Sequence, residues 1–145
     1  MTTNNMLAKI ERQRKHFPHS GKFYNEKFVI YAIWNETTGK AYIGKSCRIS
    51  NRIEQHFGSL RRNKHPNAKM QNDFNKGHKF FWLVLQDAVE GEQAAFTEQM
   101  WMLRLKTYED SQGYNTKDTY FFRKSKDGTG YEAGPGLKGI LQCRE

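Results

Sequence analysis

The chain of 145 residues has few cysteines and prolines and no long apolar run. Cys47 and Cys143 are far apart and belong to no Cys/His cluster, so neither a disulfide framework nor a zinc site is expected. No stretch approaches the roughly 20 apolar residues of a membrane-spanning helix. Residues 1–17 also lack the apolar run of roughly 7 to 15 residues that a secretory signal needs. We therefore expect a single soluble, cytoplasmic domain with short flanks.

Acidic residues are also scarce, because 24 Lys and Arg face 15 Asp and Glu and leave a net charge of +9. The excess is concentrated in residues 45–79, which contain nine basic and two acidic side chains. Such a segment favours binding of a polyanion, because neutralised phosphates release condensed counterions. A solvated basic surface without a partner is the alternative.

Two short segments rich in aromatic and β-branched residues, 28–34 and 41–46, flank a loop that contains glycine. This pattern predicts a β-hairpin. Alternation along the strands places Tyr42 and Gly44 on one face of the second strand. Tyr31 and Tyr42 could therefore point into one cleft, although half-buried packing would explain each tyrosine taken singly.

A helix is predicted next, because apolar residues recur every three or four positions at Ile49, Ile53, Phe57 and Leu60. Arg52 and His56 are four residues apart and lie along the border of this apolar stripe. Their side chains can reach a cleft while their stems pack. The alternative is a surface arginine and a boundary histidine with its hydrogen bonds satisfied.

Three further elements follow. A second helix is expected over Pro66–Lys76, ended by Gly77. The continuously apolar segment Phe80–Gln86 predicts a central strand. A helix over 93–106 comes next, and a turn is expected at Gly113-Tyr114-Asn115.

Glu98 stands within the apolar stripe of the last predicted helix, among Ala94, Trp101, Met102 and Leu105. An ionised carboxylate in such a stripe is costly unless it is paired or binds a metal. Glu98 is therefore the best candidate for a site carboxylate, and a buried salt bridge with an arginine is the alternative.

Together these segments resemble the GIY-YIG nuclease family: Val29-Ile30-Tyr31, Tyr42-Ile43-Gly44, the Arg52/His56 pair, Glu98 and Gly113-Tyr114-Asn115. The resemblance covers roughly residues 27–116. Val29 stands where the family most often has glycine. Because the catalytic group of that motif is the tyrosine, we expect Val29 to alter strand packing and not the chemistry.

The resemblance implies an α/β (α+β) fold, with a central three-stranded antiparallel sheet flanked by helices. It also implies hydrolysis of a DNA phosphodiester beside one Mg²⁺ or Mn²⁺ ion per active site, with Glu98 as the protein ligand of the metal. Tyr31 and His56 would activate the nucleophilic water or relay its proton. Tyr42 would position the water or the phosphate, Arg52 would stabilise charge on the phosphate, and Asn115 would hold the geometry of the site.

The candidate DNA-binding residues are Gly44 and six residues of the basic segment, Lys45, Arg48, Arg61, Arg62, Lys64 and Lys69. The expected organisation is a basic extension over 1–26, the nuclease domain over 27–117 and a partly Gly-rich extension over 118–145. The N-terminal extension reads equally as a DNA-contacting arm, a packing helix or a disordered tail. The C-terminal one opens with an extra strand or packing segment at Tyr120-Phe121-Phe122 and is expected to be flexible thereafter.

The expected enzyme is a free-standing phage or mobile-element nuclease of the homing type, or a restriction-like one, in a bacterial or phage-infected cell. Its specificity would come from the nuclease domain itself, a homodimer or a partner protein. The alternatives are a catalytically silent DNA-binding module of the same fold and a protein that binds RNA or another protein through its basic surface.

Overall fold

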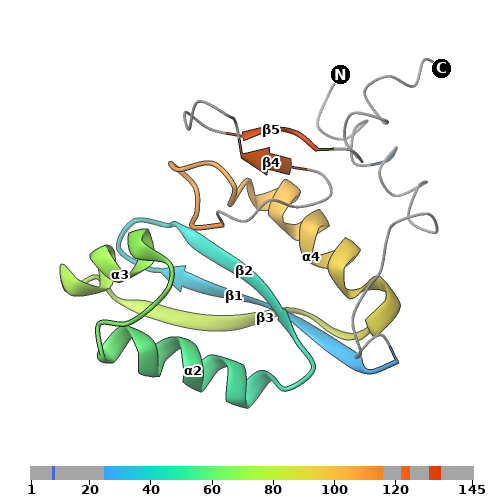
Figure 1. Ribbon diagram of the computed structural model, residues 1–145, viewed down its shortest axis with the longest axis horizontal. Coiled ribbons are helices and arrows are strands. Elements are labelled where there is room, and N and C mark those ends of the chain that lie inside the picture. The colour runs from blue at the N-terminus through green and yellow to red at the C-terminus, as the bar shows by residue number, and fades with distance from the viewer. Residues whose placement is uncertain (1–7, 9–24, 116–121, 125–130, 135–145) are drawn as a thin grey trace.

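The computed structural model describes residue 8 and residues 25–115, 122–124 and 131–134 (Figure 1). Strands β1 (Lys27–Asn35), β2 (Ala41–Ser46) and β3 (Phe80–Glu90) form one antiparallel sheet in the order β2-β1-β3. The helices that accompany it are α2 (Ile49–Arg61), α3 (Ala68–Asn75) and α4 (Gly91–Leu105). Strands β4 (Phe122–Lys124) and β5 (Tyr131–Ala133) form a separate antiparallel pair. The predicted three-stranded sheet flanked by helices is confirmed.

The predicted hairpin is formed by β1 and β2, with Tyr31 opposite Gly44. The loop begins at the buried Asn35, whose side-chain oxygen accepts hydrogen bonds from the backbone N–H groups of Thr37 and Thr38. Gly39 then adopts a φ of 81°, a left-handed conformation that glycine reaches without strain. The loop therefore closes for local reasons that the sequence encodes.

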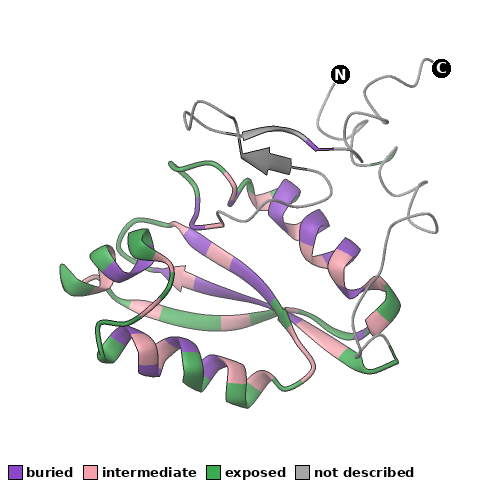
Figure 2. Ribbon diagram, in the orientation of Figure 1, coloured by how far each residue is buried: buried purple, intermediate pink, exposed green. Residues whose placement is uncertain are grey.

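The sheet is covered by helices on both faces, as Figure 1 shows. Ile30 and Ala32 pack with Ala94 and Met102 of α4 in one buried cluster. The alternate residues of β1, including Tyr31, pack with α2 and α3 on the opposite face. The residues of β1 thus alternate between the two faces, and this central strand is buried on both of them (Figure 2).

Strand β3 corrects one prediction, because it lies at the edge of the sheet and not at its centre. It is also longer than predicted, reaching Glu90, and most of its residues are exposed or half-buried (Figure 2). Trp82 is 42% exposed and Val84 46% exposed. The long apolar run therefore does not mean burial on both faces: the helices leave these two side chains uncovered.

Helix α3 begins two residues later than predicted. Asn67 caps it, because its side-chain oxygen accepts a hydrogen bond from the backbone N–H of Met70 at 3.0 Å. The helix ends just before Gly77, whose φ of 87° stops it as predicted. Helix α4 begins and ends slightly earlier than the predicted 93–106.

The Gly113-Tyr114-Asn115 turn runs along the outer edge of β2. Gly113 forms a parallel bridge with Ala41, and the backbone N–H of Tyr114 donates to the Ala41 carbonyl at 3.0 Å. The Tyr114 ring is buried, and its hydroxyl donates to Asp73 of α3 at 2.5 Å while accepting from the Asn35 amide at 2.9 Å. Burial and the Asp73 hydrogen bond raise the pKa of Tyr114 to about 12. The turn is thereby fixed to both the sheet and α3.

The predictions for the two extensions fall mostly outside the described residues. Of the proposed strand at Tyr120-Phe121-Phe122, only Phe122 is described, and it begins β4. Within the described part of the chain, no helix has the length and apolar character needed to cross a membrane.

Candidate active site

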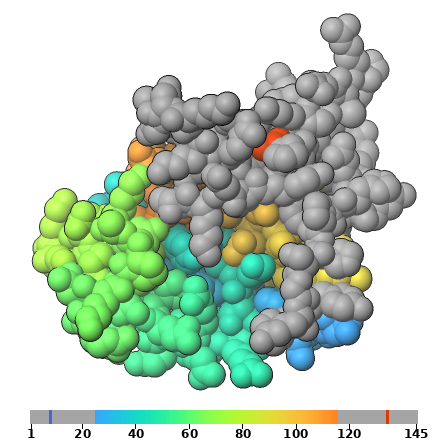
Figure 3. Space-filling view, in the orientation of Figure 1, coloured from blue at the N-terminus to red at the C-terminus, as the bar shows by residue number. Residues whose placement is uncertain are grey.

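A pocket of about 360 Å³ opens at the edge of β2, between α2 and α4. In the space-filling view, atoms of β2 reach the surface between the green of α2 and the yellow of α4 (Figure 3). The lining combines β2, α2, the loop before α3, α4 and the turn at residue 115. Its residues are Tyr42, Ile43, Lys45, Arg52, His56, His65, Pro66, Asn67, Ala95, Glu98, Gln99, Met102 and Asn115.

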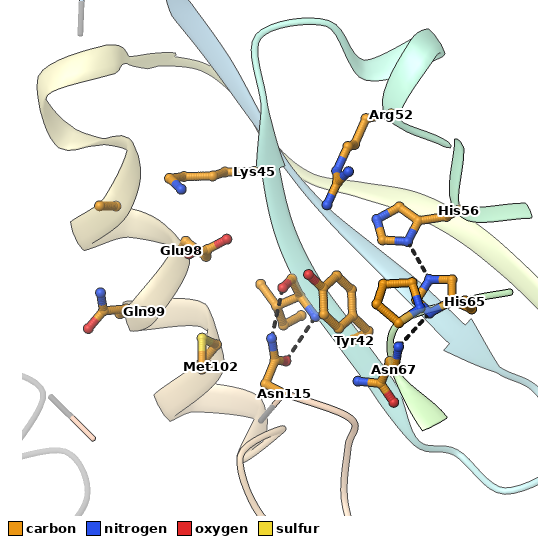
Figure 4. Close-up of a pocket in the computed structure, with 13 residues that line it drawn as sticks. Tyr42, Lys45, Arg52, His56, His65, Asn67, Glu98, Gln99, Met102 and Asn115 are labelled. Atoms are coloured by element: carbon orange, nitrogen blue, oxygen red, sulfur yellow. Dashed lines mark hydrogen bonds between the residues drawn. The ribbon is translucent and has the colours of Figure 1, made fainter. Parts of the chain in front are cut away.

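Helix α2 directs Arg52 and His56 toward this pocket (Figure 4). Ile53 and Leu60 of the same helix are buried against the sheet, so residues 52 and 56 fall on the border of the apolar stripe, as predicted. The Arg52 guanidinium lies near enough to Tyr31 and Tyr42 to interact electrostatically with both hydroxyls. Burial lowers the pKa of Arg52, but the two hydroxyls raise it by more, so Arg52 stays a cation.

Tyr42 lines the pocket, whereas Tyr31 lies behind it and is only 1% exposed. The Tyr31 hydroxyl is 2.8 Å from Nε2 of His56, which connects it to the lining. Burial is the largest cause that raises the pKa of Tyr31, and the nearby Tyr42 adds to it. Tyr42 shows the same direction of pKa shift, caused by burial and then by the charge of Glu98.

Gly44 explains how Tyr31 can lie where it does. A Cβ at this position would overlap the ring and hydroxyl of Tyr31. The glycine of the second motif therefore leaves space for the tyrosine of the first, which is a packing function inside the hairpin.

His65 belongs to the site, although it was not among the predicted site residues. Its Nε2 lies 2.9 Å from Nδ1 of His56, the two rings stack, and its Nδ1 accepts the backbone N–H of Asn67 at 3.0 Å (Figure 4). Burial, then the charge of Arg52, lowers the pKa of His65. The sequence offers one feature that could have indicated His65 as a site residue, which is its position in the loop between two predicted helices, directly before Pro66.

Glu98 faces the pocket from α4, on the side opposite Arg52 and His56 (Figure 4). Ala94 and Met102, one turn away from Glu98 on either side, are buried against the sheet, which confirms this part of the predicted apolar stripe. The carboxylate itself is half-buried and lies near enough to the tyrosines to raise the pKa of both. Lys45 of β2 projects toward the same space.

The donor set fits a divalent ion bound by one carboxylate. Among the described residues, no cluster of three or more His, Cys, Asp or Glu could form an all-protein metal site. Mg²⁺ commonly uses one or two carboxylates and fills its other positions with water and substrate phosphate. Glu98 at the wall of an open pocket is suited to that kind of binding.

Asn115 closes the edge of β2 beside the pocket. Its side-chain oxygen accepts the backbone N–H of Ile43 at 3.0 Å, and its amide donates to the Ile43 carbonyl at 2.9 Å. The side chain thus pairs with the backbone of Ile43 as a neighbouring strand would, and both residues line the pocket.

The predicted DNA-binding residues lie in different settings. Lys45 lines the pocket, Gly44 is buried, and the others are exposed. Arg61 forms an ion pair with Glu54 at 3.0 Å, and Lys69 forms one with Asp110. Among the ion pairs between described residues, none involves Arg48, Arg62 or Lys64.

Comparisons with known proteins agree with this geometry. The family model of the GIY-YIG catalytic domain matches residues 27–115. The solved catalytic domain of the homing endonuclease I-TevI is 30% identical, with a TM-score of 0.57, and the match covers 63% of this chain and 100% of that domain. A mutant of the catalytic domain of the intron endonuclease I-TevI is 29% identical with the same TM-score, over 64% of this chain and 96% of that one. No curated protein matches significantly.

The family match spans more than half of the chain, and the fold, the order of the motifs and the solved relatives agree with it. The chain therefore belongs to the GIY-YIG family and is a GIY-YIG-like endonuclease.

Proposed function

We propose that the chain hydrolyses phosphodiester bonds of DNA with the help of one divalent metal ion, Mg²⁺ or Mn²⁺. One observation carries the proposal: a carboxylate, Glu98, faces the guanidinium of Arg52 and the phenol of Tyr42 across a single pocket. A phosphate between them would meet a metal-binding oxygen on one side and hydrogen-bond donors on the other.

Hydrolysis requires that a water oxygen bond to phosphorus while one P–O ester bond breaks. The water gives up a proton, and the leaving oxygen gains one. Glu98 would hold the metal ion, which supplies Lewis-acid stabilisation of the phosphate and of the oxygens around it. Arg52 would donate to the phosphate oxygens as negative charge develops there.

The tyrosines and His56 would act around the attacking water. Tyr42, which lines the pocket, would position the water or the phosphate, while Tyr31 and His56 would act on the proton of the water. The pKa of both tyrosines is raised, so both are neutral phenols at pH 7 in the protein alone. A tyrosine could therefore accept a proton only after positive charge nearby had lowered its pKa.

DNA would be held by the basic surface beside the pocket. Lys45, Arg48, Arg62 and Lys64 are the exposed basic residues best placed to contact phosphates, because Arg61 and Lys69 already have acidic partners. The nuclease domain would comprise residues 27–117, with the extensions 1–26 and 118–145 at either side. The similarity to the catalytic domains of a homing endonuclease and an intron endonuclease favours a homing-type enzyme of a phage or mobile element over a restriction-like one.

A plasmid assay tests this proposal. Supercoiled DNA is incubated with the full chain in Mg²⁺ or Mn²⁺, with and without a chelator, beside a structured RNA of similar length. Nicked or linear DNA that forms only with the metal supports the proposal. Salt-sensitive binding of DNA without cleavage would indicate a silent DNA-binding module, and preference for RNA or a protein would indicate an interaction protein. Either result would overturn it.

A further inference from the structure

Three hydrogen bonds connect the loop before α3 to Tyr31. The backbone N–H of Asn67 donates to Nδ1 of His65 at 3.0 Å. Nε2 of His65 and Nδ1 of His56 are 2.9 Å apart, and Nε2 of His56 lies 2.8 Å from the Tyr31 hydroxyl. His56 is 5% exposed and Tyr31 1%, so the bond between them is sheltered from water, and the two bonds of His65 are partly buried.

A backbone amide can only donate, and this determines the direction of the whole chain of bonds. Since Nδ1 of His65 accepts, its neutral ring carries the proton on Nε2 and donates to His56. Nδ1 of His56 must then accept, which places the His56 proton on Nε2, facing Tyr31. The Tyr31 oxygen is therefore the final acceptor.

We propose that His65 is a positioning residue that fixes His56 as a neutral hydrogen-bond donor to Tyr31. This inference deepens the proposed nuclease function and rests on it for its catalytic meaning, but the hydrogen-bond direction itself does not depend on cleavage. The charge of Arg52 acts in the same direction, because it too favours the ionised form of Tyr31.

The direction has a mechanistic consequence. His56 cannot accept the Tyr31 proton unless its own proton shifts to Nδ1, which would force a proton onto Nδ1 of His65, against the Asn67 N–H. His56 therefore stabilises negative charge on Tyr31 and does not remove its proton. The lowered pKa of His65, caused by burial and the charge of Arg52, agrees with a neutral ring.

The imidazole nitrogen signals of the ¹⁵N-labelled full chain, without DNA, test the direction directly. At pH 7.5 we expect His56 and His65 both to carry the proton on Nε2 and none on Nδ1. A proton on Nδ1 of His56 would overturn the inference, whether or not the protein cuts DNA. Absence of cleavage with the expected tautomers would instead contradict the proposed function alone.

Two substitutions separate positioning from general stability. His65→Gln keeps an N–H donor toward His56, whereas His65→Leu removes it. We expect kcat to fall at least about tenfold in His65→Leu with little change in KM, and to recover most of the loss in His65→Gln, because one hydrogen bond to the reacting group is at stake. The His65→Leu protein should also show mixed His56 tautomers.

His78→Gln is the matched control, because His78 is a half-buried histidine that hydrogen-bonds with Asn35 outside the pocket. It should leave the His56 tautomer and kcat unchanged. Equal loss of kcat in His65→Gln and His65→Leu, with an unchanged His56 tautomer in both, would overturn the inference.

Discussion

Gly44 and Tyr31 belong to different motifs, but the position of the tyrosine ring depends on the absence of a side chain at the glycine. The Tyr31 hydroxyl reaches His56 because nothing projects from Gly44 beneath its ring. The tyrosine that we propose to act in catalysis and the glycine that makes room for its ring are thus equally necessary to the geometry.

Gly44→Ala should destabilise the protein by about 1–3 kcal/mol, because the new methyl group would overlap the rigid Tyr31 ring. Urea unfolding measures the difference. Gly58→Ala in α2 is the matched control: its Cβ would meet only the flexible end of Arg62, and alanine favours a helix interior by about 0.5–1 kcal/mol. Equal stability changes in the two variants would contradict this packing account.

His65 predicts how stability depends on pH. Burial and the Arg52 charge lower its pKa below the ordinary 6.5, so the folded protein binds this proton less readily than the unfolded chain. The resulting stability is fully present above pH 6.5 and is lost as pH falls through the folded pKa. Urea unfolding from pH 7.5 to 5 should therefore show a smaller decline for His65→Gln than for wild type. Parallel declines would exclude His65 as a source of the pH dependence.

At the scale of single residues, the sequence indicates those site residues that belong to a recognisable motif, and the structure places them at or beside one pocket. His65 escapes because its partners, His56 and Asn67, are brought to it by the loop between α2 and α3. A loop conformation has no periodicity, so no pattern in the sequence reports the contact.

At the scale of elements, the edge of β2 organises the pocket. Helices α2 and α4 lie on opposite faces of the sheet, and their site residues meet only because β2 ends the sheet between them (Figure 1, Figure 4). Asn115 occupies part of that edge, where its side chain pairs with the backbone of Ile43.

Asn115→Ala should cost about 1–3 kcal/mol of stability, because it leaves the backbone N–H and carbonyl of Ile43 without this partner. Chemical denaturation gives the value, with Asn72→Ala on the exposed side of α3 as a control expected to change stability by less than about 0.5 kcal/mol. If Asn115→Ala proves as mild as the control, the amide does not hold the edge of β2.

The sequence predicts correctly those elements that have a local pattern of apolar residues. It does not predict the position of a strand in the sheet, or which side chains the helices cover. The hairpin, α2 and α4 follow from alternation and helical spacing, and Gly77 ends α3 as expected. The predicted central position of β3 is wrong. Its apolar residues suggest burial on both sides, whereas Trp82 and Val84 are exposed in a strand at the edge of the sheet. Strand order depends on contacts between distant segments, which a local run of residues does not encode.

At the scale of the whole molecule, the net charge of +9 favours binding of a polyanion such as DNA. Part of the basic surface is neutralised locally by the Arg61–Glu54 and Lys69–Asp110 pairs. The remaining exposed cations near the pocket should therefore account for the salt dependence of DNA binding.

Replacing Arg62 or Lys64 by Gln should weaken binding of any duplex sequence. If each contacts one phosphate, the slope of log K against log salt should become shallower by about 0.9 for each substitution. Fluorescence anisotropy over a salt series measures this, and Lys27→Gln, whose lysine is paired with Glu90, is the control. Unchanged slopes would place the DNA elsewhere.

The central claim is that Glu98 is the carboxylate on which cleavage depends. Metal-dependent cleavage and DNA affinity are to be measured together for wild type, Glu98→Gln and Glu92→Gln, the last an exposed carboxylate on the same helix. We expect Glu98→Gln to reduce cleavage by at least about 100-fold, since metal stabilisation contributes several kcal/mol, while DNA affinity stays within about threefold because the basic surface is intact. Glu92→Gln should cut like wild type, and cleavage by Glu98→Gln at the wild-type rate would contradict the account.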